Sequence, residues 1–408
     1  MQVSTHAVVH TAQATARPAA SSRHDAELGL CAVSYAVAEP VELHQELVGA
    51  AAQLVLDTAH AHCHKHRDKL DGFEGSEAEH EALLEVLRTA ANLASREIDA
   101  LKRRRKVRLD VTLDLVWIAG QECFLAHVGD GRIDLLRKGL AHKLTQDHTE
   151  GEDTLDSLTG LDAVARPRQP LSRALGRLAQ VEVETMSLQL AEGDRLLVSG
   201  PFIHRALDDL AIREAATDPD PDGLTARLIG HARDGGVSQD IALGLVTIGP
   251  SSAQARQPNG RLTTLARIPL FAYCTERELL AIAGITRPTR YRAGNYVFRQ
   301  GDRSQGLFLL VQGTVEVMVD EQVIATLGPG ANFGEMSMLD QPERSASVRV
   351  QDEAEVLLIT RAAFFSLLKR DPTLAVKVLW NMLLRLSASL RSTSGRLSEL
   401  QTHAQDPE

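Results

Sequence analysis

The stretch Phe333–Val348, FGEMSMLDQPERSASV, determines how the second half of this 408-residue chain is interpreted. Glu335 and Arg344 stand on either side of a Met-Ser-Met-Leu segment and an Asp-Gln-Pro break. Backbone N–H groups that open a short helix at Gly334–Glu335 can point at an anion such as a phosphate. Arg344 adds a planar, permanently charged fork for the oxygens of that anion, and Glu335 can accept a hydrogen bond from a sugar hydroxyl. The stretch therefore predicts a small anion cradle.

This cradle resembles the phosphate-binding cassette of cyclic nucleotide-binding domains. The resemblance covers about residues 267–385 and includes RQGDRSQGLFLLVQGTVEVMV at residues 299–319. Within the cassette it is carried by Phe333, Gly334, Glu335, Arg344, Ser345, Ala346 and Val348. The alternative is a surface turn in which the Glu and the Arg are incidental.

The resemblance implies a role for each ligand-binding candidate. Arg344 would pair with the exocyclic phosphate oxygens, and Glu335 would accept the ribose 2′-OH. The backbone of Gly334, Met336 and Ser337 would frame the sugar and phosphate. Ser345 would add an N–H group and its hydroxyl. In the family, Thr after the Arg favours cyclic GMP and Ala favours cyclic AMP. Ser345 is also the residue of a family member, the catabolite activator protein, so the resemblance favours cyclic AMP and leaves cyclic GMP open.

Glycines punctuate short strands on the N-terminal side of the cassette, which predicts an antiparallel double-sheet barrel, a jelly roll with flanking helices. The polar run PSSAQARQPNG precedes it. We expect a first domain at 1–250, a linker at 251–266, a nucleotide-binding domain at 267–385 and a C-terminal helix and tail at 386–408. Leucines at heptad spacing in residues 374–400 suggest a homodimer, and packing back on the barrel explains the first turns equally well.

The first 250 residues predict an α+β fold, with helices packed on antiparallel sheets. Helical periodicity covers about residues 41–69 and 77–106, and a further helix is expected near Leu171–Leu178. Arg108–Ile118 alternates as a strand. Gly129-Asp130-Gly131 separates two later strands as a hairpin signal.

Four blocks in this half resemble the metal-dependent serine/threonine phosphatases of type 2C, over roughly residues 20–250. The blocks are AHVGDGRIDLLRKGLAHKLTQDHTE (126–150), LSRALG (171–176), LAEGDRLLVSG (190–200) and GVSQDIALGLVTI (236–248). The resemblance implies an α/β-sandwich and a site where carboxylates hold two divalent ions around a water.

The carboxylate positions of that site are changed in this chain. The family's Asp-Gly pair and its following Gly fall on Tyr35, Ala36 and Ala38, and the Ser-Asp-Gly falls on Ser199-Gly200-Pro201. A later acidic position is His204, and the phosphate-binding Arg is Ala20. The late Asp position is Gln239, unless the register shifts by one residue to Asp240. Only Asp25 keeps its carboxylate, as a weak metal candidate.

We therefore expect a pseudophosphatase with no catalytic residues and no required cofactor. Asp130, Asp147 and His148 survive in loops that we interpret as architectural. Mg²⁺ or Mn²⁺ would be needed only if the domain is active. The alternative is an active, cyclic-nucleotide-regulated serine/threonine protein phosphatase with a non-standard metal site.

Composition narrows the class of protein. A net charge of −10 argues against broad attraction to nucleic acid or to membranes. No apolar run approaches the roughly 18 residues of a spanning helix, and MQVSTHAVVH lacks the pattern of a secretory signal. Four scattered cysteines predict reduced thiols and a cytoplasmic protein.

Two local patterns have competing interpretations. Lys102–Arg108 is basic, but it falls at a helix C-terminus, where cations are favoured; nucleic acid is the alternative. His60, His62, His64 and His66 form two i,i+4 pairs about 200° apart on a helix, so they cannot form one site. A solvated face is expected there, with zinc or nickel binding as the alternative.

Together these features predict a signalling protein that binds a cyclic nucleotide. The nucleotide would change how the phosphatase-like domain meets a protein partner, such as a phosphoprotein or a kinase. A purely structural first domain remains a third possibility.

Overall fold

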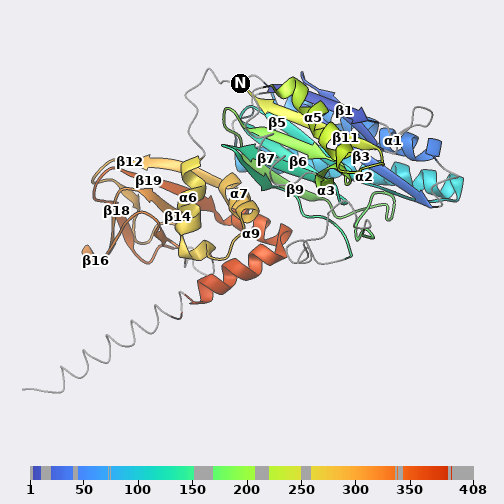
Figure 1. Cartoon of the computed structure of the whole chain (residues 1–408). Coiled ribbons are helices and arrows are strands. Elements are labelled where there is room, and N and C mark those ends of the chain that lie inside the picture. Colours follow the sequence, from blue (N-terminus) through green and yellow to red (C-terminus); the bar gives the residue numbers. More distant parts are fainter. Residues whose placement is uncertain are drawn as a thin grey trace, which may run out of the picture. The chain divides into compact units, whose positions relative to one another are not determined.

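The computed structural model describes residues 3–10, 20–39, 45–71, 73, 75–150, 169–206, 220–249, 259–335, 338, 343–384 and 387. The chain forms two compact units, Met1–Gln257 and Pro258–Glu408. Figure 1 shows their elements coloured along the sequence.

The first unit is a sandwich of two antiparallel sheets with helices on its outer faces. One sheet has the order β2-β3-β5-β6-β9, with β4 paired to β3. Its strands are β2 (Ala20–Asp25), β3 (Leu30–Glu39), β4 (Arg108–Val111), β5 (Leu113–Ala119), β6 (Glu122–Val128) and β9 (Glu184–Gln189). The other sheet has the order β1-β11-β10-β7-β8. Its strands are β1 (Val3–His10), β7 (Arg132–Arg137), β8 (Leu140–Lys143), β10 (Arg195–Ser199) and β11 (Ile241–Ile248).

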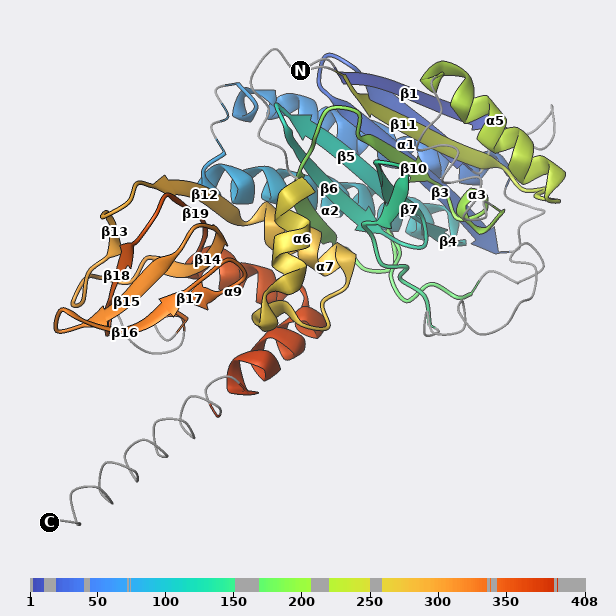
Figure 2. The ribbon, with the colours of Figure 1, turned by 60° about the vertical axis from the view of Figure 1, so that its left-hand side comes forward.

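Two long antiparallel helices, α1 (Gln45–Lys65) and α2 (Glu77–Arg105), cover the first sheet. Figure 2 shows α5 (Pro221–Asp234) beside β1 and β11 of the other sheet, with the short α3 (Ile203–Ala206) near it. Helix α2 starts with a capping box of Ser76 and Glu79, which satisfies its first N–H groups. It buries an apolar stripe at three- and four-residue spacing that includes Leu83, Leu87, Ala94 and Ile98. The predicted helix of residues 77–106 is confirmed.

Two sequence expectations for this unit are wrong and a third is right in part, because the strand expected at Arg108–Ile118 is present as two strands, β4 and β5. Strand β5 is buried along its whole length rather than on one face, because it lies between the helices and the second sheet. The turn Gly129–Gly131 joins no hairpin, since it leads from β6 in one sheet to β7 in the other. Residues 171–178 form no helix. Instead Leu175 bridges to Val111, and the Gly176 N–H donates to Ser95 Oγ over 3.0 Å.

The second unit is a barrel of two four-stranded antiparallel sheets, as predicted. One has the order β12-β19-β14-β17 and the other β13-β18-β15-β16. Their strands are β12 (Thr286–Tyr291), β13 (Tyr296–Phe298), β14 (Gly306–Gln312), β15 (Val315–Val319), β16 (Gln322–Leu327), β17 (Asn332–Phe333), β18 (Ser347–Val350) and β19 (Ala354–Thr360). A core between the sheets includes Phe308, Val315, Phe333 and Val348.

Helices close one side of the barrel around a second apolar core. They are α6 (Asn259–Arg267), the 3₁₀ turn η5 (Pro269–Phe271), α7 (Glu276–Gly284), α9 (Arg361–Arg370) and a helix at residues 372–384. Helix α6 lies in the range expected as linker (251–266), so ordered structure begins earlier there than the polar sequence indicated. Of the predicted C-terminal helix and tail at 386–408, all but Ser387 lie outside the described residues.

The four cysteines are free thiols, as expected, and Cys31, Cys63 and Cys123 are buried. Burial raises the pKa of the Cys31 and Cys63 thiols to about 12. Among the residues that the structure describes, none of the helices has the length and apolarity needed to cross a lipid bilayer.

Candidate functional site

Arg344 is held in place by its own backbone. Its N–H donates to the Asp302 carbonyl and its carbonyl accepts from the Gly301 N–H, each over 2.9 Å. The side chain enters the barrel and is only 4% exposed. Nη2 donates to the Gly306 carbonyl over 2.9 Å and Nη1 to the Gly334 carbonyl over 3.3 Å. The guanidinium is thus fixed between the start of β14 and the end of β17.

Two glycines shape this site, Gly334 by making room for the guanidinium and Gly306 by allowing the close approach of β19. Gly334 has φ +79°, and a Cβ there would lie 2.5 Å from Arg344 Nη1. Gly306 has φ +154°, and a Cβ there would lie 2.1 Å from the Ile359 carbonyl oxygen. Only glycine avoids both the unfavourable dihedral and the clash. The sequence marked Gly334 but not Gly306, whose role depends on the pairing of β14 with β19.

The charge of Arg344 is poorly solvated. Burial lowers the pKa of its guanidinium to about 10, while the negative charges of Asp302 and Glu335 act in the opposite direction. A desolvated cation whose N–H donors reach neutral carbonyl oxygens is a strong position for an anion. Glu335 is half-buried, and its carbonyl accepts from the N–H of the buried Met338 over 2.9 Å.

The structure brings four of the six predicted ligand-binding residues into one described region. Gly334 and Glu335 follow β17, Arg344 lies opposite them, and Ser345 is exposed next to it. The other two, Met336 and Ser337, lie outside the described residues.

In the first unit, the fold brings together several of the positions that correspond to metal ligands in type 2C phosphatases. Ala20 of β2 pairs with Tyr35 of β3. The ring of Tyr35 packs edge-on against Phe202, with the ring centroids 5.2 Å apart. Phe202 lies between Gly200 and His204, so residues far apart in sequence meet here. The side chains at this point are the methyl group of Ala20 and the aromatic rings of Tyr35 and Phe202.

The remaining positions compared with metal ligands, Gly200, His204 and Gln239, carry no acidic side chain. The N–H of Gly200 donates to the Ala242 carbonyl over 3.0 Å. His204 is buried in α3, and the Gln239 carbonyl accepts from Arg233 Nη1 over 2.7 Å. Two divalent ions bridged by a water need several carboxylate oxygens. This donor set does not fit them.

Asp25, the weak metal candidate, is engaged in the turn after β2. Its Oδ2 lies 2.9 Å from His60 Nε2, and its Oδ1 accepts from the Leu28 N–H over 3.0 Å. The His60 hydrogen bond is the main cause that lowers the pKa of Asp25. The nearby Arg23 pairs with Asp57 instead. Both Asp25 and His60 therefore have local structural partners.

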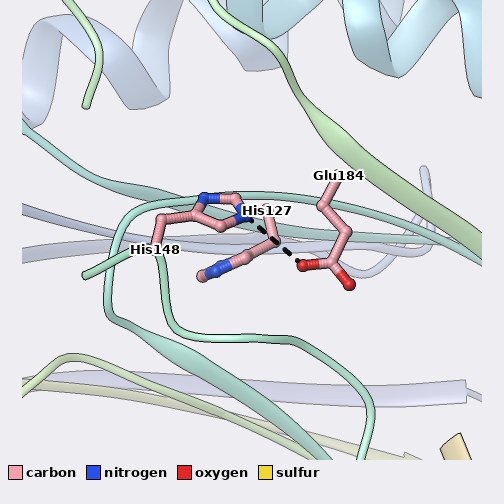
Figure 3. A group of neighbouring side chains, drawn as sticks. All are labelled: His127, His148 and Glu184. Atoms are coloured by element: carbon pink, nitrogen blue, oxygen red, sulfur yellow. Dashed lines mark ion pairs between the residues drawn. The ribbon is translucent and has the colours of Figure 1, made fainter. Parts of the chain in front are cut away.

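A buried group that sequence reasoning did not assemble has the composition of a metal site. His127, His148 and Glu184 offer ligand atoms within 4.8 Å of one another (Figure 3). However, His127 Nδ1 lies 2.7 Å from an oxygen of the buried Asp114, and its Nε2 lies 2.9 Å from the Gln146 carbonyl oxygen. A carboxylate and a carbonyl can only accept, so both ring nitrogens carry protons and neither is available to a metal.

The protonation of His127 follows from its surroundings. Burial alone lowers the pKa of His127, but the charge and hydrogen bond of Asp114 raise it above the ordinary value. His148 differs, because its Nδ1 accepts from the Gly129 N–H over 3.1 Å and its Nε2 faces Glu184 at 3.6 Å. Burial lowers the pKa of His148. These side chains therefore form a hydrogen-bonded network in which His148 holds the Gly129 N–H of the turn after β6.

Comparisons with known proteins agree with this architecture. A family model described as cyclic nucleotide-binding domain matches residues 288–371. The cyclic AMP receptor protein of Thermus thermophilus is 36% identical over 112 residues, 26% of this chain and 52% of that protein. Protein phosphatase PhpP of Streptococcus pneumoniae is 27% identical over 150 residues, 36% of this chain and 61% of that protein. The chain spans about half the length, or less, of the first curated relatives it matches.

A solved structure covers the first unit. The serine/threonine phosphatase PstP/Ppp of Mycobacterium tuberculosis superposes with a TM-score of 0.50 at 25% identity, over 61% of this chain and 99% of that one. The first unit therefore has the fold of type 2C phosphatases. The second unit contains a cyclic nucleotide-binding domain, and the chain combines the two.

Proposed function

We propose that the chain is an intracellular signalling protein that binds a cyclic nucleotide, cyclic AMP in preference to cyclic GMP, in the cassette of the second unit. The buried, desolvated guanidinium of Arg344 carries this proposal. In the bound state Arg344 pairs with the exocyclic phosphate oxygens and Glu335 accepts the ribose 2′-OH. Backbone groups of Gly334, Met336 and Ser337 frame the ring, and Ser345 adds an N–H and its hydroxyl.

The choice of purine rests on Ser345. Its exposed position beside Arg344 lets the hydroxyl face a ligand from outside the barrel. A cyclic AMP receptor protein among the relatives supports the adenine preference. A competition between the two nucleotides measures this preference directly.

Calorimetry of the whole chain with cyclic AMP, cyclic GMP and 5′-AMP tests the binding proposal. Arg344→Ala should weaken cyclic AMP binding by about 2–5 kcal/mol, because it leaves a desolvated phosphate without its partner. Arg349→Ala is the matched control, since Arg349 pairs with Glu316 on the barrel surface. Equal affinity of wild type and Arg344→Ala would remove the cassette assignment.

We propose further that the first unit is a protein-interaction module rather than a phosphatase. Tyr35, Gly200 and His204 stand where carboxylates are needed, and the Tyr35–Phe202 ring pair occupies the same region. Its partner is a protein, such as a phosphoprotein or a kinase. Retaining the fold while losing the ligands preserves the surface on which a phosphoprotein docks.

The competing proposal is an active phosphatase with an unusual metal site. Manganese-dependent hydrolysis of p-nitrophenyl phosphate or of a phosphopeptide, lost in Asp25→Ala, would establish it. Absence of both metal-dependent hydrolysis and manganese binding supports the interaction module. Pull-down with and without cyclic AMP distinguishes the interaction module from a purely structural first unit. A purely structural unit would capture the same partners in both conditions.

The helix at residues 372–384 supports a homodimer as part of this proposal. Leu374, Val378 and Met382 face the barrel core. A second apolar stripe is exposed, with Val376 at 70%, Leu379 at 39%, Trp380 at 59% and Leu383 at 60%. Its spacing of three and four residues is that of a coiled-coil seam, and such contiguous exposed apolar surface marks an interaction site. Two copies packed along this stripe would link nucleotide binding to the C-terminal helices.

A further inference from the structure

Three phenylalanine rings from three strands meet beside Arg344. Phe298 ends β13, Phe308 lies in β14 and Phe333 ends β17. The centroids of Phe308 and Phe333 are 5.5 Å apart with the rings nearly parallel, and Phe298 lies 5.5 Å and 6.0 Å from them. Phe298 belongs to one sheet of the barrel and the other two rings to the opposite sheet. The trio therefore connects the two sheets where the arginine enters.

The guanidinium of Arg344 lies on this trio. Its central carbon is 4.0 Å from the ring centroid of Phe298 and 5.3 Å from that of Phe308. Both distances are within the range of a cation–π interaction, which is strongest when the cation is desolvated. At 4% exposure, Arg344 meets that condition.

A ring and a carboxylate stabilise a buried arginine in different ways. A carboxylate takes N–H donors, which are the groups that a phosphate needs. A ring faces the plane of the guanidinium and takes none of them, so the N–H edge stays available. Here two of the edge donors reach the carbonyls of Gly306 and Gly334 over 2.9 and 3.3 Å. Backbone carbonyls are neutral acceptors, which an anion can outcompete.

Building on the proposed function, we propose that Phe298 is a positioning residue for nucleotide binding. Its ring holds the Arg344 guanidinium flat and charged inside the barrel, with the N–H edge turned to the cassette, and thereby sets the affinity for a cyclic phosphate. Phe308 supports the same plane from the other sheet. Phe298 acts through Arg344 and needs no contact with the nucleotide.

The first test compares cyclic AMP affinities of whole-chain variants by calorimetry. Phe298→Leu keeps an apolar side chain but removes the ring, and should weaken binding about 3- to 30-fold. Phe298→Tyr keeps the ring and should bind within about threefold of wild type. The control is Phe364→Leu, the same substitution at a more deeply buried phenylalanine that packs on Phe365 in the core under the helices.

The second test separates electrostatics from packing. Phenylalanine at position 298 is replaced by its mono-, di- and trifluorinated forms. Fluorine keeps the ring close to its original size and reduces the negative electrostatic potential of the ring face. The dissociation constant should rise stepwise with each fluorine. A constant affinity across the series, or equal losses in Phe298→Leu and Phe364→Leu, would overturn the positioning role while leaving nucleotide binding intact.

A nucleotide-free measurement keeps the two proposals distinguishable. In wild type, the Phe298 ring current should shift the Arg344 side-chain N–H resonances, assigned with Arg344→Lys, upfield from ordinary arginine positions. Phe298→Leu should return them toward those positions and Phe364→Leu should not. Unshifted wild-type resonances would refute the stacking. If the resonances shift but wild type binds neither cyclic nucleotide, the proposed function fails, and the affinity role of Phe298 fails with it.

Discussion

Tyr35 and Phe202 pack ring against ring, with centroids 5.2 Å apart and ring planes inclined at 64°. One residue comes from β3 and the other from the turn after β10, so the contact joins the two sheets of the sandwich. Edge-to-face aromatic pairs of this kind contribute about 0.5–1.5 kcal/mol beyond the area they bury. An active two-metal site would instead require carboxylate ligands in this region.

The first prediction is that metal removal leaves the stability of this protein unchanged. Chelation by EDTA should not lower the thermal midpoint, and manganese should not raise it, because only a ligand that binds the folded state shifts that midpoint. Tyr35→Ala, in contrast, should cost about 2–4 kcal/mol through the lost ring contact and the cavity. Scanning fluorimetry and urea unfolding measure both. A manganese-dependent rise of several degrees in wild type would revive the active-site alternative.

The second prediction concerns Glu335 and the ribose. Glu335→Gln should weaken cyclic AMP binding by about 1–3 kcal/mol, because a charged acceptor is replaced by a neutral one. The same loss should appear when wild type binds 2′-deoxy cyclic AMP. If the carboxylate and the hydroxyl contact each other, the two losses do not add. Calorimetry of both proteins with both ligands completes the cycle, and fully additive losses would place Glu335 away from the 2′-OH.

The third prediction concerns the exposed stripe on the helix at residues 372–384. Leu383→Glu should convert a dimer to a monomer, since two copies of a buried carboxylate would face each other across the seam. Ile324→Glu is the matched control, because Ile324 is 57% exposed against 60% for Leu383 but lies on β16. Sedimentation at several concentrations reports the mass. A wild-type chain that stays monomeric throughout would remove the dimer from the proposal.

The fourth prediction is a pH dependence that arises from His127. Its folded pKa lies above the ordinary value of 6.5 because of Asp114. Its stabilising contribution is therefore fully present below about pH 6.5 and is lost as the pH rises through the folded pKa. His127→Gln leaves Asp114 buried without its cation, which should cost about 3–5 kcal/mol near pH 6.

The difference between wild type and His127→Gln isolates this group from other titrations. Urea unfolding should show that the difference shrinks as the pH rises above about 6.5, the ordinary pKa of histidine. A His142→Gln variant serves as control, because that histidine belongs to β8, in the other sheet from the β5 strand that carries Asp114. A difference that grows with pH would mean that His127 is neutral in the folded protein.

Local patterns were sufficient to predict much of the fold. The apolar periodicity of α2 and the strands on either side of Gly129–Gly131 needed only short-range chemistry, and so did the glycine-punctuated barrel. The cassette was likewise recognisable from one stretch, because Gly334 and Arg344 are only 10 residues apart in the chain and Glu335 lies between them. Their ligand-binding roles remain predictions.

The features that could not be predicted depend on contacts between residues far apart in the chain. The turn Gly129–Gly131 has the composition of a hairpin, and only the pairing of β7 with β10 and β8 assigns its strands to different sheets. The contact of Tyr35 with Phe202 depends on the packing of several elements. So does the protonation of both ring nitrogens of His127. Nothing in the sequence spacing of Phe298, Phe308 and Arg344 reveals that they stack.

The sequence by itself determined which residue can offer a positive charge to a phosphate and which metal-ligand positions lack a carboxylate, because side-chain chemistry is fixed by residue type. Only the tertiary structure decided how the Arg344 guanidinium is oriented and what surrounds it. Burial removes water from that cation, and the aromatic rings and carbonyls that replace the water come from strands separated in the chain. Its electrostatic environment is therefore a property of the folded barrel.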